Sequence, residues 1–231
     1  MKYKLTSESK TVNGKKLFQI QALKDFGTVK KGDLGGWIEK ESNLSQENNA
    51  WVYGNARVYD DARVYGNVCV SGNAWVSGNA WVYDDAWVYD DARVYGNARV
   101  YGNACVSGNA WVYGNARVYD DAWVSGNSGK ARVYDDARVY DDARVYGNVW
   151  VSGNAKVSGN AHLSKKTHCI NFNNLKFNLT IVPGFVFGGC RTFTHEEFEN
   201  LTLEKCLDKT WSESELEGYK LCLKVWELSQ K

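Results

Sequence analysis

Several features of other protein classes are scarce or absent in this chain of 231 residues. Its six cysteines include no Cys-x-x-Cys pair, which argues against a zinc ribbon and a thioredoxin-type redox site. No hydrophobic run approaches the roughly 20 residues of a membrane span, and the segment from Met1 to Leu5 lacks the apolar core of a signal peptide. We therefore expect a soluble cytoplasmic protein with reduced thiols and no membrane partner.

An excess of one charge is also lacking. The chain has 28 Lys and Arg against 27 Asp and Glu, a net charge of +1, and residues 51–163 carry 10 basic residues against 12 Asp. A global basic field for nucleic acid and an acidic surface that imitates DNA are therefore both disfavoured. DNA is not an expected partner. Histidine is rare, with three in the chain, and Pro183 is the one proline.

What the chain has in abundance is a six-residue repeat. The pattern Ala-x-Val-(Tyr/Ser)-(Gly/Asp)-(Asn/Asp) occurs nineteen times between Trp51 and Leu163, with one insertion of three residues, Ser128 to Lys130. Ala and Val alternate with outward positions, as in a strand that is buried on one face. The Gly-Asn and Asp-Asp pairs tolerate tight turns and left-handed backbone. Each repeat therefore predicts a short strand followed by a corner.

Short strands with a corner every six residues fit a triangular coil of three repeats, or 18 residues per turn. Nineteen repeats give a little over six coils, and a spacing of about 4.8 Å makes the stack roughly 30 Å long. The small Ala and branched Val side chains suit its narrow interior. The fold class is therefore an all-β solenoid.

The pattern resembles the hexapeptide-repeat, left-handed β-helix superfamily, whose repeat reads aliphatic, small or acidic, two free positions, small, free. The segment from Val58 to Arg63 matches it except that Tyr or Ser takes the second position. The lead-in from Lys31 to Ile38, followed by Asn43 to Ser45, is similar to a bacterial and phage or prophage subgroup of such solenoids. The resemblance implies a left-handed parallel coil, homotrimers, and in many members acyl transfer from coenzyme A with a His general base.

The flanking segments predict two further parts. Residues 1–36 read as a small β-rich cap with a hairpin turn at Asn13-Gly14. The β-helix is expected over 37–164, where Ile38 and Leu44 begin the count with Ser42 facing inward. Residues 165–231 read as an α+β domain that caps the open end or oligomerises. In that domain we expect strands at 169–172, 175–182 and 185–187, then two helices begun by capping boxes at 194–197 and 212–215, the second burying Leu216, Tyr219, Leu223 and Trp226.

Residues 18 apart, or 21 across the insertion, stack on neighbouring coils and define three faces. The Arg–Trp face carries, in alternation, Arg57, Trp75, Arg93, Trp111, Arg132 and Trp150. The Arg–Tyr face carries Arg63, Trp81, Arg99, Arg117, Arg138 and Lys156 beside Tyr65, Tyr83, Tyr101, Tyr119 and Tyr140. The Trp–Cys face carries Trp51, Cys69, Trp87, Cys105, Trp123, Arg144 and His162.

These faces admit two interpretations. Stacked residues can simply cover the solenoid wall, with cation–π contacts on the Arg–Trp face and corner Asp neutralising Arg. Alternatively, the surfaces bind a partner or a phosphorylated aromatic ligand, because Arg pairs with phosphate and aromatic rings stack on bases. A wall this rich in Trp also favours burial of the first or third face in a homo-oligomer, with a trimer preferred.

Metal and thiol chemistry are weakly indicated. The Asp pairs scatter over all three corners and interchange with Gly-Asn, so we interpret them as corner residues and expect no metal. Cys69 and Cys105 lie two coils apart, about 10 Å, which is too far for a disulfide. In the tail, Cys190, Arg191 and His195 are weak site candidates, and we expect Cys190 to act as a small buried hydrophobe.

The choice between enzyme and binding protein depends on histidine. His162, in the last repeat, is the first His of the solenoid, and the three-residue insertion is too short to wall an acceptor pocket. We therefore favour a non-catalytic protein without a cofactor that binds a host component, either a defence protein or a nucleotide signal, in the host cytoplasm if it is phage-encoded. The site candidates are then the arginines and tryptophans of the Arg–Trp face with Arg63, Arg99, Arg117 and Arg138. The alternatives are a coenzyme A-dependent acyltransferase with His162 as base, and a purely structural scaffold.

Overall fold

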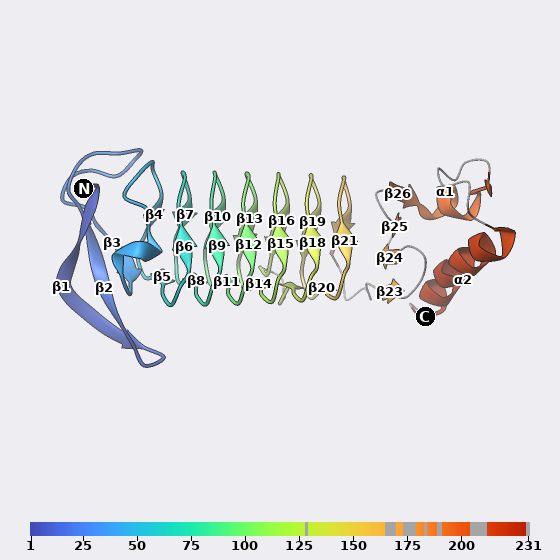
Figure 1. Ribbon diagram of the computed structural model, residues 1–231, viewed down its shortest axis with the longest axis horizontal. Coiled ribbons are helices and arrows are strands. Elements are labelled where there is room, and N and C mark those ends of the chain that lie inside the picture. Colours follow the sequence, from blue (N-terminus) through green and yellow to red (C-terminus); the bar gives the residue numbers. More distant parts are fainter. Residues whose placement is uncertain are drawn as a thin grey trace.

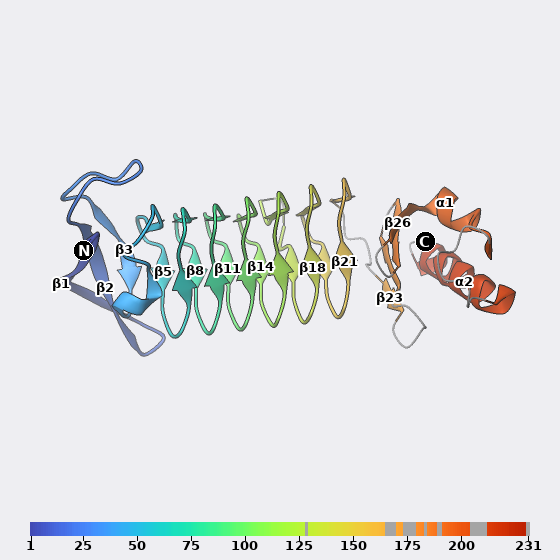
Figure 2. The same cartoon turned by 45° about the horizontal axis from the view of Figure 1, so that its top comes forward.

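A computed structural model describes residues 1–127, 129–164, 170–172, 179–182, 184–188, 191–203 and 212–229. The molecule is a straight stack of coils with a β-hairpin cap at one end and a small sheet with two helices at the other (Figures 1 and 2). Strands β4 to β22 form the coils, and each strand pairs in parallel with the strand one coil away.

The strands divide into three solenoid sheets. The nine-stranded sheet contains β1 (Tyr3–Val12), β2 (Lys15–Ala22), β3 (Leu34–Ile38), β5 (Arg57–Val58), β8 (Trp75–Val76), β11 (Arg93–Val94), β14 (Trp111–Val112), β17 (Arg132–Val133) and β20 (Trp150–Val151). The six-stranded sheet contains β6 (Arg63–Val64), β9 (Trp81–Val82), β12 (Arg99–Val100), β15 (Arg117–Val118), β18 (Arg138–Val139) and β21 (Lys156–Val157). The seven-stranded sheet contains β4 (Trp51–Val52), β7 (Cys69–Val70), β10 (Trp87–Val88), β13 (Cys105–Ser107), β16 (Trp123–Ser125), β19 (Arg144–Tyr146) and β22 (His162–Leu163).

The predicted 18-residue coil is confirmed by the register. Arg99 lies opposite Arg117 within the six-stranded sheet, and Arg117 lies opposite Arg138, three residues further on because of the insertion. Backbone hydrogen bonds join successive coils, for example from Arg99 N to Ala116 O at 2.9 Å. The inward Ala and Val side chains are fully buried along the stack and form one continuous core. Alternate burial within each strand therefore places every x residue of the repeat on the outer wall.

The corners explain why Gly-Asn and Asp-Asp interchange. Except at Gly126, beside the insertion, the first residue of each pair has positive φ, about 56° to 82° for Gly in the solenoid and 55° to 60° for Asp, a conformation open to these residue types. Five of the six Asp residues at the position, all but Asp120, also accept the N–H of Gly one coil later, as Asp60 does from Gly78 at 3.2 Å and Asp141 from Gly159 at 3.0 Å. The Asp pairs thus have a structural explanation in the corner itself.

The N-terminal cap continues the coil register. The expected Asn13-Gly14 turn is confirmed, with both residues at positive φ between β1 and β2. Strand β3 pairs with β2 on one side and β5 on the other, and Leu44 lies opposite Val64. The inward placement of Ser42 was wrong. A 3-10 helix, η1 (Glu41–Asn43), leaves Ser42 exposed and buries Asn43.

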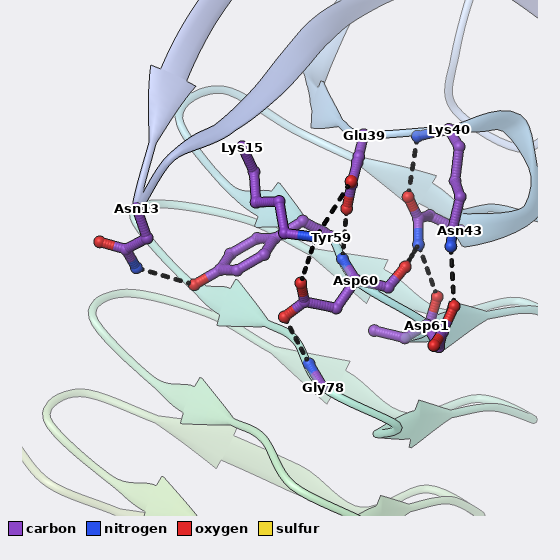
Figure 3. Close-up of polar contacts among 10 residues, drawn as sticks. Asn13, Lys15, Glu39, Lys40, Asn43, Tyr59, Asp60, Asp61 and Gly78 are labelled. Carbon is purple, nitrogen blue, oxygen red and sulfur yellow. Dashed lines mark hydrogen bonds and ion pairs between the residues drawn. The ribbon is translucent and has the colours of Figure 1, made fainter.

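Polar contacts lock this cap onto the first coil (Figure 3). Lys15 lies between Glu39 and Asp60, with Nζ–carboxylate distances of 3.4 and 3.2 Å. Asn43 donates from Nδ2 to the carbonyl oxygens of Asp60 and Ala62 at 3.0 and 2.9 Å. The cap therefore covers the open end of the solenoid and satisfies its exposed carbonyl groups.

The other end is covered by a four-stranded antiparallel sheet of β23 (Ile170–Phe172), β24 (Leu179–Val182), β25 (Phe185–Gly188) and β26 (Arg191–Thr194). Val182 and Phe187 join the solenoid core. Both helices, α1 (His195–Glu199) and α2 (Glu213–Ser229), begin at the expected capping boxes, and the four predicted residues of α2 are buried. Strand β26 was not predicted, and residues 173–178 and Pro183 lie outside the described residues.

The all-β solenoid with an α+β C-terminal region is thus confirmed, while the left-handed sense of the coil and the exact domain boundaries stay predictions. No helix among the described residues is long and apolar enough to span a membrane.

Candidate functional site

The Arg–Trp face forms the continuous ladder that the alternation predicts. Each guanidinium carbon lies 4.7 to 5.0 Å from the centroid of a Trp ring one coil away, in the pairs Arg57–Trp75, Arg93–Trp75, Arg93–Trp111, Arg132–Trp111 and Arg132–Trp150. The Nε atoms of Arg57 and Arg132 are buried without a hydrogen-bond partner. These guanidinium groups are therefore already occupied by indole rings, which favours a structural role for the face.

The ladder extends one step beyond the predicted residues, to Trp37. Trp37 lies opposite Arg57 in register, and the ammonium group of Lys10 lies 4.1 Å from the Trp37 ring centroid. Burial, with a smaller contribution from the charge of Arg57, lowers the pKa of Lys10 to about 8. The 20-residue step from Trp37 to Arg57, which Ile38 shares with Val58, is the signal that could have revealed it.

The Arg–Tyr face carries a longer tyrosine stack than the Arg–Trp face, beside which Tyr95, Tyr113 and Tyr134 also stack. Its five tyrosines, Tyr65, Tyr83, Tyr101, Tyr119 and Tyr140, form one stack with ring centroids 4.8 to 5.0 Å apart and planes within 3° of parallel. At these distances a base cannot enter between two rings, so the stack offers its ring edges and hydroxyl groups to solvent. Burial raises the pKa of Tyr83 and Tyr119 to about 12, helped by the neighbouring tyrosines. Their hydroxyl groups therefore stay protonated and can donate hydrogen bonds.

Beside this stack runs a row of arginines with few partners. Arg63 and Arg99 lie over Trp81, at 5.5 and 5.3 Å from its centroid. Within the described part of the chain, the guanidinium groups of Arg117 and Arg138 make no hydrogen bond, ion pair or ring contact, although the two residues lie opposite each other on adjacent coils. Like charges directly opposite in a sheet are destabilising, so this row has an electrostatic cost that a bound anion would remove.

No direct ion pair between an Arg and a corner Asp occurs among the described residues, although the charge of Arg63 contributes, after Lys40, to the lowered pKa of Asp61. Among the residues that the structure describes, the ion pairs of Asp lie in the N-terminal cap and its junction with the first coil and use lysines, as with Lys40 and Asp61 at 2.7 Å. The corner carboxylates instead accept hydrogen bonds from Gly N–H groups or from Asn side chains of neighbouring coils. No group of three or more His, Cys, Asp or Glu in the described chain is arranged to hold a metal ion.

The Trp–Cys face is uneven. Trp51 is buried under the N-terminal cap by Tyr3 and Phe26, whereas Trp87 and Trp123 are exposed. Between these two lies a hollow of about 450 Å³, lined by Ser71, Trp87, Tyr89, Asn103, Cys105, Asp121 and Trp123. Trp87, Cys105 and Trp123 were predicted to share one face, but the hollow and its other lining residues were not predicted.

The histidine and tail candidates are dispersed. His162 is exposed opposite Arg144 at the end of the seven-stranded sheet. Its ring makes no hydrogen bond, ion pair or ring contact in the described structure, whereas a general base normally has an orienting partner. His195 has its Nε2 atom 2.8 Å from the Val182 carbonyl oxygen and packs on Trp226. Arg191 lines a separate surface cavity with Glu196 and Glu197, and Cys190 lies outside the described residues.

Comparison with known proteins agrees with this architecture. The YdcK β-solenoid repeat model matches the coils at 50–66, 62–78, 86–102, 92–108, 98–114, 110–126, 131–147 and 137–153. The chain is also 41% identical over 59 residues to "Uncharacterized acetyltransferase YdcK" of Escherichia coli (strain K12), a match that covers 22% of this chain and 18% of that protein. The matched repeats are therefore similar to YdcK β-solenoid repeats, and the architecture is of the hexapeptide-repeat type of β-helix.

Proposed function

We propose that this protein is a non-catalytic binding protein that holds an anionic partner on its Arg–Tyr face. The observation that supports the proposal most directly is the pair Arg117 and Arg138, opposite each other and without ion pairs in the described structure. On the Arg–Trp face, by contrast, the guanidinium groups lie between indole rings. The arginines of the Arg–Trp face are thus occupied by the protein's own aromatic rings, whereas on the Arg–Tyr face Arg117 and Arg138 keep their charges available beyond the Trp81 contacts of Arg63 and Arg99.

The chemistry of the Arg–Tyr face fits a phosphorylated or carboxylated group. Arginine binds such groups through two parallel N–H bonds, and the adjacent tyrosine hydroxyl groups add neutral donors. A nucleotide signal suits the face because phosphates can lie on the arginines while its polar groups accept from the tyrosine hydroxyl groups. We propose a host component as the source of this ligand, on the basis of the phage-like lead-in.

Charge-matched variants test the proposal. Binding of ATP and of inorganic pyrophosphate would be measured by calorimetry for the native protein, for Arg117→Gln with Arg138→Gln, and for Arg93→Gln with Arg132→Gln. Each double variant removes two positive charges. We expect at least a tenfold loss of affinity in the first and less than a threefold loss in the second, with binding that weakens as salt rises. Equal losses in both variants, or no binding to the native protein, would refute the proposal.

Acetyl transfer is the second candidate, favoured by the name of the relative and by the exposed His162. The relative matches only part of this chain, and His162 lacks an orienting partner among the described residues. Incubation with acetyl-coenzyme A and a panel of amine and hydroxyl acceptors tests this function. Release of coenzyme A that disappears in His162→Ala, but persists in Arg117→Gln with Arg138→Gln, would establish it over the binding proposal.

We also propose that copies associate as a homotrimer through the Arg–Trp face, which ends in the exposed ring of Trp150. This arrangement leaves the Arg–Tyr face open to its ligand. Sedimentation velocity tests it: a trimer that dissociates in Trp150→Glu supports the assignment, and a monomer at all concentrations rejects it.

A further inference from the structure

The hollow on the Trp–Cys face lies in a column of three stacked side chains like one on the Arg–Trp face, except that Cys takes the place of the central Arg. On the Arg–Trp face, Arg93 lies between Trp75 and Trp111, one coil from each, with its guanidinium 4.7 and 5.0 Å from their centroids. On the Trp–Cys face, Cys105 holds the middle position between Trp87 and Trp123 in the same parallel register. The short Cys side chain leaves unfilled the space that Arg93 occupies in the other column.

The exposed rings are consistent with this vacancy. Trp87 is 55% exposed and Trp123 is 39% exposed, whereas Trp75 and Trp111, with an arginine on each side, are only partly exposed. The Trp123 indole N–H donates to Ser107 Oγ at 3.3 Å, and the Tyr89 hydroxyl lies near the side chains of Cys105 and Ser107. These contacts fix the walls and floor of the hollow before any ligand arrives, which reduces the entropic cost of binding.

The charge of the lining selects the sign of the ligand. The residues around the hollow include the Asp121 carboxylate and contain no Lys, Arg or His. Asn103 donates to Asp121 Oδ1 at 2.9 Å and holds this carboxylate at the rim. Two indole faces and a phenol ring attract cations through their quadrupoles, and a carboxylate accepts the paired N–H groups of a guanidinium.

One further charge lies nearby. The Arg144 guanidinium is 5.9 Å from the Trp123 ring centroid, in the next coil beyond the hollow. This does not prevent a second cation on the other face of that ring, because Trp111 carries Arg93 and Arg132 on its two faces in the same way.

We propose that this hollow is a binding site for the guanidinium group of an arginine side chain presented by a partner protein, inserted between Trp87 and Trp123 and paired with Asp121. The site lies on a different sheet from the Arg–Tyr face and does not depend on anion binding there.

The test uses small arginine analogues and the indole N–H signals of the tryptophans in a 1H–15N spectrum. The probes are Nα-acetyl-arginine amide, which imitates an arginine within a peptide, the matching citrulline derivative, which has the same shape without the charge, and the matching lysine derivative. Free arginine distinguishes a metabolite from a peptide side chain. Signals of Trp87 and Trp123, assigned through Trp→Phe variants, should shift with acetyl-arginine amide, while that of Trp150 should not.

The decisive variant is Cys105→Arg, which rebuilds in the hollow the arrangement that Arg93 already has. We expect it to fold normally and to weaken acetyl-arginine amide binding at least tenfold, whereas Cys105→Ser should retain binding. Asp121→Asn should weaken binding and reduce the preference over the citrulline derivative. The proposal is overturned if the native protein shows no shift, if citrulline or lysine derivatives bind as tightly, if free arginine binds more tightly than the amide, or if Cys105→Arg binds normally.

Discussion

The arginines of the two basic faces should contribute differently to stability. Arg93→Ala removes two cation–π contacts, at 4.7 and 5.0 Å. At about 0.5–1 kcal/mol per contact at an exposed or half-exposed site, the expected loss is about 1–2 kcal/mol. Arg117→Ala removes a side chain without a ring contact in the described structure and relieves repulsion with Arg138. Its expected effect lies within about 0.5 kcal/mol of zero.

Urea unfolding followed by circular dichroism measures the difference. Each coil contacts only its neighbours. If the coils unfold together, the loss of stabilising contacts in one coil should lower the unfolding midpoint of the whole solenoid. A double-mutant cycle of Arg93→Ala with Trp111→Ala should give a coupling energy of about 0.5–1 kcal/mol. Equal midpoint shifts for Arg93→Ala and Arg117→Ala, or a coupling energy of zero, would refute the different contributions of the two faces to stability.

Three further predictions concern the cap, the corners and the tyrosine stack. Asn43→Ala leaves the buried Ala62 carbonyl and the partly buried Asp60 carbonyl without a donor and should cost about 2–3 kcal/mol in urea unfolding, while Asn49→Ala, at an exposed corner, should change little. Asp84→Gly should be nearly neutral, whereas Asp84→Ala should destabilise by about 1 kcal/mol more, because Asp84 has a φ of 60°; equal midpoints would contradict this. The folded-state pKa values of Tyr83 and Tyr119, about 12, exceed the ordinary 10.0. Their stabilising contribution is therefore complete below pH 10 and is lost as pH rises from 10 towards 12, which unfolding midpoints at pH 9 and 11 and a tyrosinate absorbance titration would detect.

The repeat predicted those parts of the fold that depend on periodicity. The offset of 18, or 21 across the insertion, correctly paired Arg93 with Trp111 and Arg117 with Arg138, because successive coils must align their inward Val residues. The capping boxes at Thr194 and Ser212 were also predictable, since they depend on residues only three positions apart.

Features set by contacts outside the repeat were not predicted. The 3-10 turn that buries Asn43 in place of Ser42 depends on carbonyl groups of the following coil, at Asp60 and Ala62. The burial of Trp51 depends on Phe26 and Tyr3 of the cap. The hollow at Cys105 arises from the relative sizes of three stacked side chains, and the columns themselves contained that signal: Trp-Cys-Trp on one face against Trp-Arg-Trp on another.

The most direct test of the central claim is a 1H–15N spectrum of the arginine Nε–H groups recorded as pyrophosphate is added. An anion held on the Arg–Tyr face should shift the signals of Arg117 and Arg138 and leave those of Arg93 and Arg132, which lie between indole rings, unchanged. Shifts at Arg93 and Arg132, or no shift at Arg117 and Arg138, would contradict the assignment of the two basic faces.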